Sequence, residues 1–360
     1  MKLIVQPRDG IQPLLNAIKA SRKSIDILIF RLDWKELEAA LKAASQRGVA
    51  VRALIAHTNR GGEPKLRSLE MRLLDAGITV ARTADDLIRY HGKMMIVDQR
   101  ALYLLSFNFL HLDIEHSRGF GIVTRNARAV QEALKLFEAD TNRQEYKVNG
   151  TSALVVSPVN ARDKLAAFIE KAQKQLMIYD PKVVDRQMLG IINERAKAGV
   201  DIRIIGSASV RNSSLKVAPL TSMRLHTRTI IRDGRAAFIG SQSLRPPELD
   251  SRREVGITVV DPKIVSELVS TFEKDWDATG FDEIRSAAEG EEAPPAEVAQ
   301  ALVKEMPPLV NAVKQAVRRA VNKAGNNALE DAELKSTLKD MVKKAAKEAV
   351  RELSQAAEEV

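Results

Sequence analysis

The chain has 360 residues, 45% of them hydrophobic, which is enough for two cores of ordinary domain size. It has no cysteine, which excludes disulfides, thiolate nucleophiles and cysteine-ligated zinc and fits a reducing compartment. The net charge is +9, and residues 1–285 hold the excess, with 45 Lys and Arg against 34 Asp and Glu. This field favours an anionic partner, whether a phosphate, a nucleic acid or an acidic membrane surface.

The N-terminal residues, MKLIVQPRDGIQ, contain only a short apolar run. No stretch of the chain approaches the roughly 18 consecutive apolar residues that a membrane span requires. We therefore expect a cytoplasmic chain without a transmembrane anchor.

Two segments share one plan. Residues 24–56 read SIDILIFRLDWKELEAALKAASQRGVAVRALIA, and residues 174–206 read KQLMIYDPKVVDRQMLGIINERAKAGVDIRIIG. Each has an apolar run, a helical stretch, a Gly-Val pair and a second apolar run, which is typical of a βαβ unit. Gly48 and Gly199 correspond at an offset of 151 residues. Each half is therefore predicted to be α/β, with a mostly parallel sheet covered by helices.

Further along the chain, the offset between the repeats falls to 135. LFEAD, ending at Asp140, matches TFEKD, ending at Asp275. An insertion in the first half, around GGEPKLRSLEMRLLDAG, accounts for the difference and is predicted to be a loop and a helix that could cover one side of a cleft. We expect two halves, residues 1–148 and 149–285, related by a pseudo-twofold axis.

The composition changes after residue 285. Residues 286–298, SAAEGEEAPPAEV, are predicted to be an acidic linker, and residues 299–360 an α-helical tail with a break at Gly325. Packing of the tail as a helical hairpin, self-association and docking on a surface all remain open. Its basic cluster, which comprises Lys343, Lys344, Lys347 and Arg351, would allow peripheral contact with an anionic membrane.

A set of polar residues occurs twice at one spacing, in HGKMMIVDQRALYLLSFN and in HTRTIIRDGRAAFIGSQS. The first copy holds His91, Lys93, Asp98, Ser106 and Asn108, and the second holds His226, Arg228, Asp233, Ser241 and Ser243. Strand alternation would put His91 and Lys93 on one face, where imidazole and ammonium can grip one anion. Asp98 and Asp233 would face the other way and are predicted to be structural.

Two such faces, brought together by the pseudo-twofold axis, suit a phosphodiester. One neutral histidine can attack phosphorus, the other can protonate the leaving oxygen, and the cations can stabilise the developing charge. The sequence has neither a metal-ligand cluster nor a Gly-rich phosphate loop, so we expect no metal and no cofactor.

The doubled pattern H-x-K-x4-D-x6-G-S-x-N resembles the phospholipase D superfamily, which includes phospholipases, cardiolipin synthases, tyrosyl-DNA phosphodiesterases and endonucleases. The likeness covers about residues 10 to 280. It implies a metal-independent, ping-pong mechanism through a covalent phosphohistidine, within a monomeric catalytic unit. Phosphate contacts are expected from the remaining polar members of the motif, namely Lys93, Asn108, Arg228, Ser243, Ser106 and Ser241.

Several positions depart from the family's pattern. Leu105 stands in place of glycine, Ser243 in place of asparagine, and Arg228 in place of lysine. Arginine keeps the charge and can bind phosphate oxygens bidentately, but its longer, planar group changes the geometry of a lysine site.

The family often places a Glu 28 residues after the histidine to orient its ring. Glu254 stands there for His226, whereas Gly119 follows His91. Because a carboxylate favours the imidazolium, we assign His226 as the general acid and His91 as the nucleophile. Asp113, Glu115 or a backbone carbonyl remain open as partners that orient His91.

The other histidines have weaker signals. His57 follows an apolar strand and could rim the cleft, although a loop residue is the more common outcome at such a position. His111 and His116 are expected to be loop residues.

These patterns predict a phosphodiesterase or phosphatidyltransferase that acts most readily on phospholipid. The aromatic content of 4% is poor for base stacking, and the tail could lie at the periphery of a membrane. A nuclease or DNA-end phosphodiesterase is the first alternative, because a basic surface suits DNA equally well. A weakened phosphodiester-binding module is the second, supported by Arg228, Ser243, Leu105 and Gly119.

Overall fold

The computed structural model describes residues 1–58, 63–148, 152–209 and 215–281. Residues 1–282 form one compact unit, so the two halves do not separate. The predicted linker, residues 286–298, and helical tail, residues 299–360, lie outside the described residues, as does the membrane contact assigned to the tail.

The first half runs from β1 to α5. Its elements are β1 (Lys2–Gln6), α1 (Gln12–Ala20), β2 (Ser24–Ile29), α2 (Lys35–Gln46), β3 (Ala50–Ile55), α3 (Glu63–Leu74), β4 (Thr79–Arg82), β5 (Arg89–Tyr90), β6 (Met94–Val97), β7 (Ala101–Leu105), α4 (His111–Glu115), β8 (Ser117–Thr124) and α5 (Ala127–Thr141). The predicted insertion contains helix α3.

The second half runs from β9 to α9. Its elements are β9 (Leu154–Val156), α6 (Ala161–Glu170), β10 (Gln175–Val183), α7 (Arg186–Lys197), β11 (Asp201–Ala208), β12 (Lys216–Ala218), β13 (Arg224–Leu225), β14 (Arg228–Arg232), β15 (Ala236–Gly240), α8 (Pro246–Asp250), β16 (Arg252–Arg253), β17 (Val255–Val259) and α9 (Pro262–Asp277). Both predicted βαβ units are present, as β2-α2-β3 and β10-α7-β11.

Each half is built on a mixed sheet. The strand orders are β1-β8-β7-β6-β2-β3-β4 and β12-β11-β10-β14-β15-β17-β9. Only β2-β3-β4 and β10-β11-β12 pair in parallel along these paths. This differs from the mostly parallel sheets that the βαβ pattern predicts, because the motif strands follow one another through short hairpin turns, and hairpin strands must pair antiparallel.

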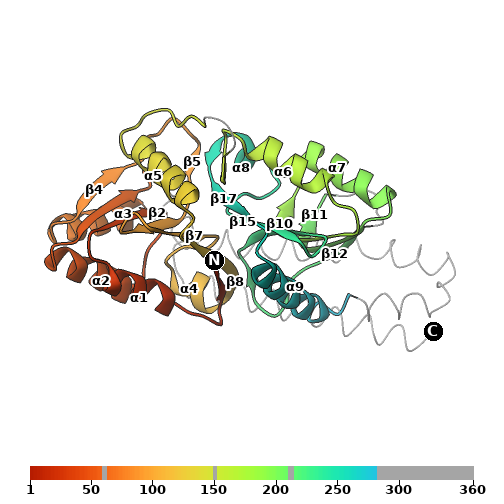
Figure 1. Ribbon diagram of the computed structural model, residues 1–360, viewed down its shortest axis with the longest axis horizontal. Helices are drawn as coiled ribbons and strands as arrows, with labels where there is room; N and C mark the ends of the chain where they lie inside the picture. Colours follow the sequence, from red (N-terminus) through yellow and green to blue (C-terminus); the bar gives the residue numbers. More distant parts are fainter. Residues whose placement is uncertain (59–62, 149–151, 210–214, 282–360) are drawn as a thin grey trace, which may run out of the picture. The chain divides into compact units, whose positions relative to one another are not determined.

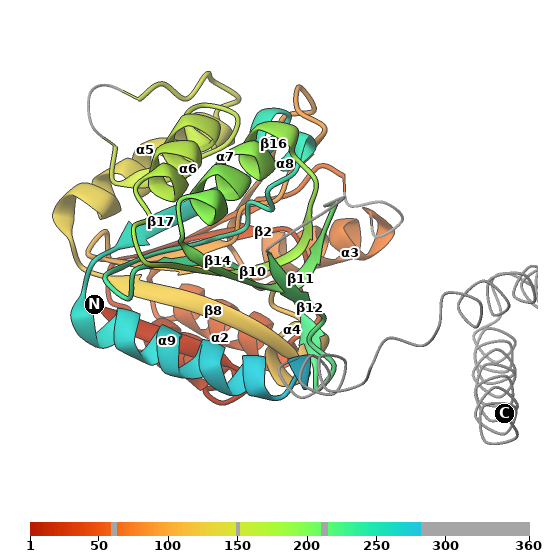
Figure 2. The ribbon, with the colours of Figure 1, turned by 90° about the vertical axis from the view of Figure 1, so that its right-hand side faces the viewer.

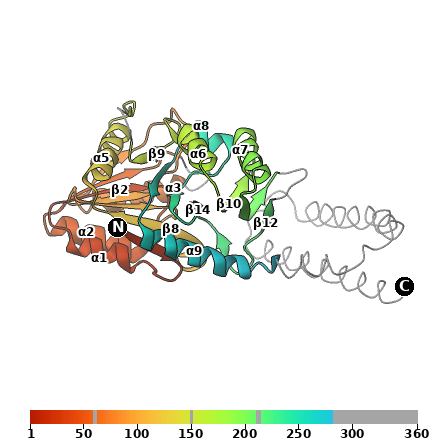
Figure 3. The ribbon, with the colours of Figure 1, turned by 45° about the vertical axis from the view of Figure 1, so that its right-hand side comes forward.

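Helices cover both sheets. In Figure 3, α1 and α2 lie on one side of the first sheet and α5 on the other. In Figure 2, α6 and α7 lie on one side of the second sheet and α9 on the other. Successive residues of a strand point to opposite faces of the sheet. Met94 therefore faces a core that both halves share, whereas Met95 faces the core under α1 and α2.

Local signals in the sequence set where the longer helices begin and end. The side chains of Asn126, Asp185 and Asp261 accept backbone N–H bonds at the starts of α5, α7 and α9. Gly48 and Gly199 follow α2 and α7 with φ of 85° and 86°, a left-handed conformation that favours glycine. The repeat therefore reproduces its turns as well as its strands.

Short strands tie the halves together beside the motif. Strand β5 pairs with β16 of the second half, and β13 of the second half pairs with β8 of the first. These are repeat-equivalent pairs, so the two halves exchange the same backbone contacts. Figure 1 shows the first half in red to yellow and the second half in green to blue. Each of the paired strands β5 and β13 leads directly into one of the two motif histidines.

Candidate active site

The backbone of each motif histidine is hydrogen-bonded to the opposite half. The His91 N–H donates to the Arg253 carbonyl at 2.7 Å, and the His226 N–H donates to the Arg118 carbonyl at 3.1 Å. His91 and Lys93 precede β6, which begins at Met94, so they do not belong to the strand that alternation predicts for them. The inter-half pairing, and not strand alternation, therefore positions both imidazoles.

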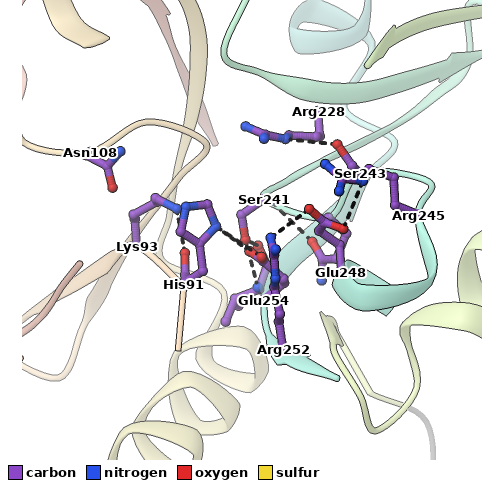
Figure 4. A network of polar contacts seen from close by, with 12 residues as sticks. His91, Lys93, Asn108, Arg228, Ser241, Ser243, Arg245, Glu248, Arg252 and Glu254 are labelled. Atoms are coloured by element: carbon purple, nitrogen blue, oxygen red, sulfur yellow. Dashed lines mark hydrogen bonds and ion pairs between the residues drawn. The ribbon is translucent and has the colours of Figure 1, made fainter. Parts of the chain in front are cut away.

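Glu254 hydrogen-bonds to His91, which corrects its predicted pairing with His226. Its two carboxylate oxygens lie 3.0 and 2.9 Å from His91 Nδ1 (Figure 4). The glutamate is fully buried and comes from the second half. Sequence spacing pairs it with the wrong histidine, because the pseudo-twofold axis carries the residue that follows β16 to the other half's imidazole.

The environment of His91 favours a neutral ring with one defined tautomer. Burial, followed by the charges of Lys93 and Arg228, lowers the pKa of His91 well below its usual value. With Glu254 at Nδ1, the proton of the neutral ring is held on Nδ1, and Nε2 keeps a free lone pair. A carboxylate at this position orients a neutral imidazole, whereas spacing had predicted that it would support the imidazolium of His226.

The first half has no room for an equivalent carboxylate. Gly119 is the repeat counterpart of Glu254, and a Cβ there would lie 3.0 Å from the Phe107 side chain. Phe107 itself is the counterpart of Gln242, which donates to the Val155 carbonyl. The two halves have thus diverged at adjoining positions.

His226 has a different carboxylate neighbour, Asp113. Its Nε2 lies 3.6 Å from Asp113 Oδ2, and its Nδ1 is buried without a hydrogen-bond partner among the described residues. Burial, followed by the charges of Arg228 and Lys93, lowers the pKa of His226, and the charge of His91 also acts on it. Asp113, which the sequence left open as a partner of His91, thus approaches the other histidine.

Lys93 and Arg228 occupy equivalent places. Lys93 Nζ donates to the His91 carbonyl, and Arg228 Nη1 donates to the His226 carbonyl, in both cases at 2.5 Å. Burial lowers the pKa of Lys93, while the nearby Glu254 opposes this shift. The structure therefore brings both cations and both imidazoles to one site.

Asn108 and Ser243 are each held by a buried aspartate. Asn108 Nδ2 donates to Asp113 Oδ2 at 2.6 Å. Ser243 donates its hydroxyl to Asp180 Oδ1 at 2.8 Å and accepts from Arg228 Nε at 3.3 Å (Figure 4). Sequence reasoning missed Asp180, although a carboxylate at the end of the apolar run LMIYD is a recognisable signal.

The remaining motif residues contact backbone. Ser106 Oγ accepts from the Phe120 N–H at 2.9 Å, and Ser241 Oγ accepts from the equivalent Val255 N–H at 3.1 Å. These bonds join neighbouring segments of each sheet. A phosphate contact from either serine stays a prediction.

Asp98 and Asp233 cap the chain that enters β2 and β10. Asp98 accepts three backbone N–H bonds from residues 22–24, and Asp233 accepts three from residues 173–175. These bonds outweigh burial and lower the pKa of both carboxyls. The two aspartates thus hold strand ends together.

The other histidines have local contacts. The His57 N–H donates to Thr83 Oγ1. His111 begins α4 and stacks on Trp34 with ring centroids 3.8 Å apart, so it is not the loop residue that we expected. His116 lies in the bend between α4 and β8, as expected of a loop residue. No contact of these three with the motif cations appears among the described residues.

Neither a metal cluster nor a membrane span is found in the part of the chain that the structure describes. No group of three or more His, Asp and Glu side chains there is placed to hold a metal ion. None of the helices there is long and apolar enough to cross a membrane.

A protein-family model and several known proteins are similar to this chain. The family model described as "Cardiolipin synthase, PLD-like domain" matches residues 14–141 and 165–276. Human mitochondrial cardiolipin hydrolase is 28% identical over 169 residues, which cover 47% of this chain and 64% of that protein. A polyphosphate kinase of Prosthecochloris aestuarii is 22% identical over 304 residues, which cover 75% of this chain and 42% of the kinase.

The chain therefore spans less than half the length of that kinase and about two thirds of the human hydrolase. The crystal structure of polyphosphate kinase from Porphyromonas gingivalis shares the fold, with a TM-score of 0.65 at 19% identity over 76% of this chain and 50% of that one. Because the family model covers both halves and their two motifs, the chain belongs to the phospholipase D superfamily.

Proposed function

We propose that this chain cleaves or transfers a phosphodiester through a covalent phosphohistidine on His91, without a metal, and that its substrate is a phospholipid. The observation that carries the proposal is the hydrogen bond between Glu254 and His91 Nδ1, made within a site that also holds Lys93 and Arg228. A single chain supplies all of these groups, so we propose that a monomer is catalytically complete.

In the proposed first step, His91 Nε2 attacks phosphorus, and the bond from phosphorus to the leaving oxygen breaks. His226 donates its proton to that oxygen, and Asp113 supports the imidazolium from which the proton comes. Lys93 and Arg228 stabilise the charge on the phosphoryl oxygens. An anionic substrate also offsets the cations that lower the histidine pKa, so its binding favours a protonated His226.

In the second step, water or an alcohol attacks the phosphohistidine. His226, now neutral, takes the proton of the attacking oxygen, and the bond from phosphorus to His91 Nε2 breaks. Water gives hydrolysis and an alcohol gives phosphatidyl transfer. Glu254 retains its hydrogen bond to His91 Nδ1 throughout, so the same ring nitrogen serves as nucleophile and leaving group.

Phospholipid is supported by the family model and by the human hydrolase, because the names of both refer to cardiolipin. The name of the bacterial relative points instead to polyphosphate, a linear polyanion. The positive charge of residues 1–285 suits either substrate, as it suits DNA. The test must therefore offer all three.

Purified protein, kept in EDTA, would be incubated with cardiolipin vesicles, with single- and double-stranded DNA, and with polyphosphate. We expect turnover of the phospholipid, its loss in His91→Ala, and normal turnover in the matched control His57→Ala. Cleavage of DNA alone would establish the nuclease alternative, and turnover of polyphosphate alone would establish polyphosphate as the substrate. A strict requirement for a divalent ion would contradict the mechanism, and binding without turnover of any substrate would support a binding module.

A further inference from the structure

The equivalent residues Asn108 and Ser243 are held by different carboxylates in the two halves. In the first half, Lys93 reaches the His91 carbonyl, and Asn108 is held by Asp113 of helix α4. In the second half, Arg228 reaches the equivalent carbonyl, but Ser243 is held by Asp180, which lies in β10. The residue of the first half that corresponds to Asp180 is Ile29, an apolar core residue, so this carboxylate is specific to the second half.

We propose that Asp180 is a positioning residue: through the Ser243 hydroxyl it fixes the guanidinium of Arg228 where the family's pattern has a lysine. The inference rests on the proposed function in assigning Arg228 to the substrate phosphate. It extends that function by naming a residue, outside the doubled motif, that sets the geometry of one of its two cations.

The hydrogen bonds around Asp180 give it one orientation. Its Oδ2 accepts from the Leu244 N–H at 2.7 Å, and its Oδ1 accepts from the Lys182 N–H at 2.9 Å and from the Ser243 hydroxyl at 2.8 Å. The side chain is 1% exposed. A buried carboxylate with three donors cannot turn without leaving a polar group unpaired, which costs about 1–3 kcal/mol per group.

This arrangement also sets the direction of the Ser243 hydroxyl. Serine has a single hydroxyl hydrogen, and here it is directed to Asp180. The oxygen lone pairs therefore remain to accept from Arg228 Nε. With Nε on Ser243 and Nη1 on the His226 carbonyl, the plane of the guanidinium is defined at two of its nitrogens, and its other N–H groups project as a fixed fork.

The same geometry accounts for two departures from the family's pattern together. Serine is shorter than asparagine, and arginine is longer than lysine, so the two changes compensate in length. The charge of Arg228 acts directly on Asp180 and partly offsets the effect of burial, which raises the pKa of that carboxyl. The substitutions at 228 and 243 are thus a matched set with Asp180, and they do not by themselves indicate a weakened site.

A double-mutant cycle between Asp180→Asn and Arg228→Lys tests the inference. The probe is the affinity for inorganic phosphate, measured by calorimetry in EDTA, with kcat and KM on a chromogenic phosphodiester as a second readout. We expect Asp180→Asn to weaken phosphate binding about tenfold in the wild-type background and less than about twofold in the Arg228→Lys background, since the effect passes through the guanidinium. Ser243→Ala should weaken binding as Asp180→Asn does, and it serves as the second variant if the latter does not fold.

The matched control is Asp26→Asn. Asp26 lies on β2, the repeat counterpart of β10, and is also 1% exposed and hydrogen-bonded to an arginine, Arg52. It should change stability without changing phosphate affinity. Equal losses for Asp180→Asn in both backgrounds would overturn the inference, as would failure of the wild type to bind phosphate. Phosphate binding needs no turnover, so a wild type that binds phosphate but cleaves no phosphodiester would instead contradict the proposed function.

Discussion

The two halves share the hydrogen bonds that hold their backbones, but they differ in the side chains near the two motif histidines. In both, an aspartate caps the strand entry, a serine bonds the neighbouring strand, and a cation reaches the histidine carbonyl. At other repeat-equivalent positions the residues differ: Glu254 corresponds to Gly119, Ser243 to Asn108, and Asp180 to Ile29. The shared contacts hold backbone positions that both halves need. The proposed reaction, by contrast, needs two histidines with different roles and therefore different surroundings.

The difference shows that the site belongs to neither half alone. His91 comes from the first half, but its orienting carboxylate, Glu254, comes from the second. His226 comes from the second half, but its carboxylate neighbour, Asp113, comes from the first. Gly119 therefore does not leave His91 without a carboxylate partner, because the second half supplies Glu254.

The largest expected effect separates the two histidines. If His91 attacks phosphorus, His91→Ala should abolish the phosphoenzyme and reduce turnover by at least about 10⁴-fold. His226→Ala should still form the phosphoenzyme with p-nitrophenol as the leaving group, because that group needs no proton. Intact-protein mass spectrometry after an acid-free quench, with peptide mapping, measures both. Label on His226 in the His91→Ala protein would reverse the assignment.

A smaller effect is expected for Glu254→Gln. Because Glu254 is hydrogen-bonded to His91, the proposed nucleophile, the variant should lower kcat by roughly 10²-fold for good and poor leaving groups alike. An effect confined to poor leaving groups would instead place Glu254 with the acid. Gly119→Glu is the complementary change, and it should unfold or distort the site, because Phe107 occupies the space that the new side chain needs.

Two repeat-equivalent, buried arginine–aspartate pairs are expected to contribute unequally to the free energy of unfolding. Arg118 binds Asp275 through two bonds of 2.7 and 2.8 Å, and Tyr179 donates to the same carboxylate. The equivalent Arg253 makes one bond of 3.1 Å to Asp140, whose Oδ2 has no partner among the described residues. We expect Asp275→Asn to lower the free energy of unfolding by about 3 kcal/mol and Asp140→Asn by about 1 kcal/mol or less. Denaturant titration would test this order.

The contribution of Asp140 to stability should depend on pH. Burial raises the pKa of Asp140 to about 6, although Arg253 opposes the shift. The stability gained from its protonated form is complete below the unfolded pKa near 4 and is lost as the pH rises through 6. Relative to Asp140→Asn, the wild type should therefore lose stability between pH 4 and 7. A constant difference across this range would contradict the raised pKa.

A similarly small effect concerns the strand caps. Asp98→Asn and Asp233→Asn each keep a side-chain acceptor but lose the charge, so each should cost about 1 kcal/mol of stability. Both carboxyls have a lowered pKa, so their contribution is present above the unfolded pKa and is lost as the pH falls through the folded one. Thermal melts at pH 7 and kcat measure the two properties separately. Unequal costs, or a loss of kcat in either variant, would show that the caps are not equivalent.

The repeat, the two α/β halves, the insertion and both motif histidines could be identified from the sequence alone. Each of these is written in local spacing: apolar runs around a helical stretch, a glycine after the helix, and polar residues at fixed intervals. Spacing along the chain sufficed because these features form within one half.

Which carboxylate lies beside which histidine, and which residues anchor Arg228, could be seen only in the folded chain. Glu254 lies 28 residues from His226 in the chain but is hydrogen-bonded to His91, 163 residues away. Asp180 is part of an apolar strand and gains its role only when β10 lies beside β14 and the segment after β15. A pseudo-twofold axis exchanges partners between halves, and no local pattern encodes that exchange, because contacts between halves are set by the burial of the shared core.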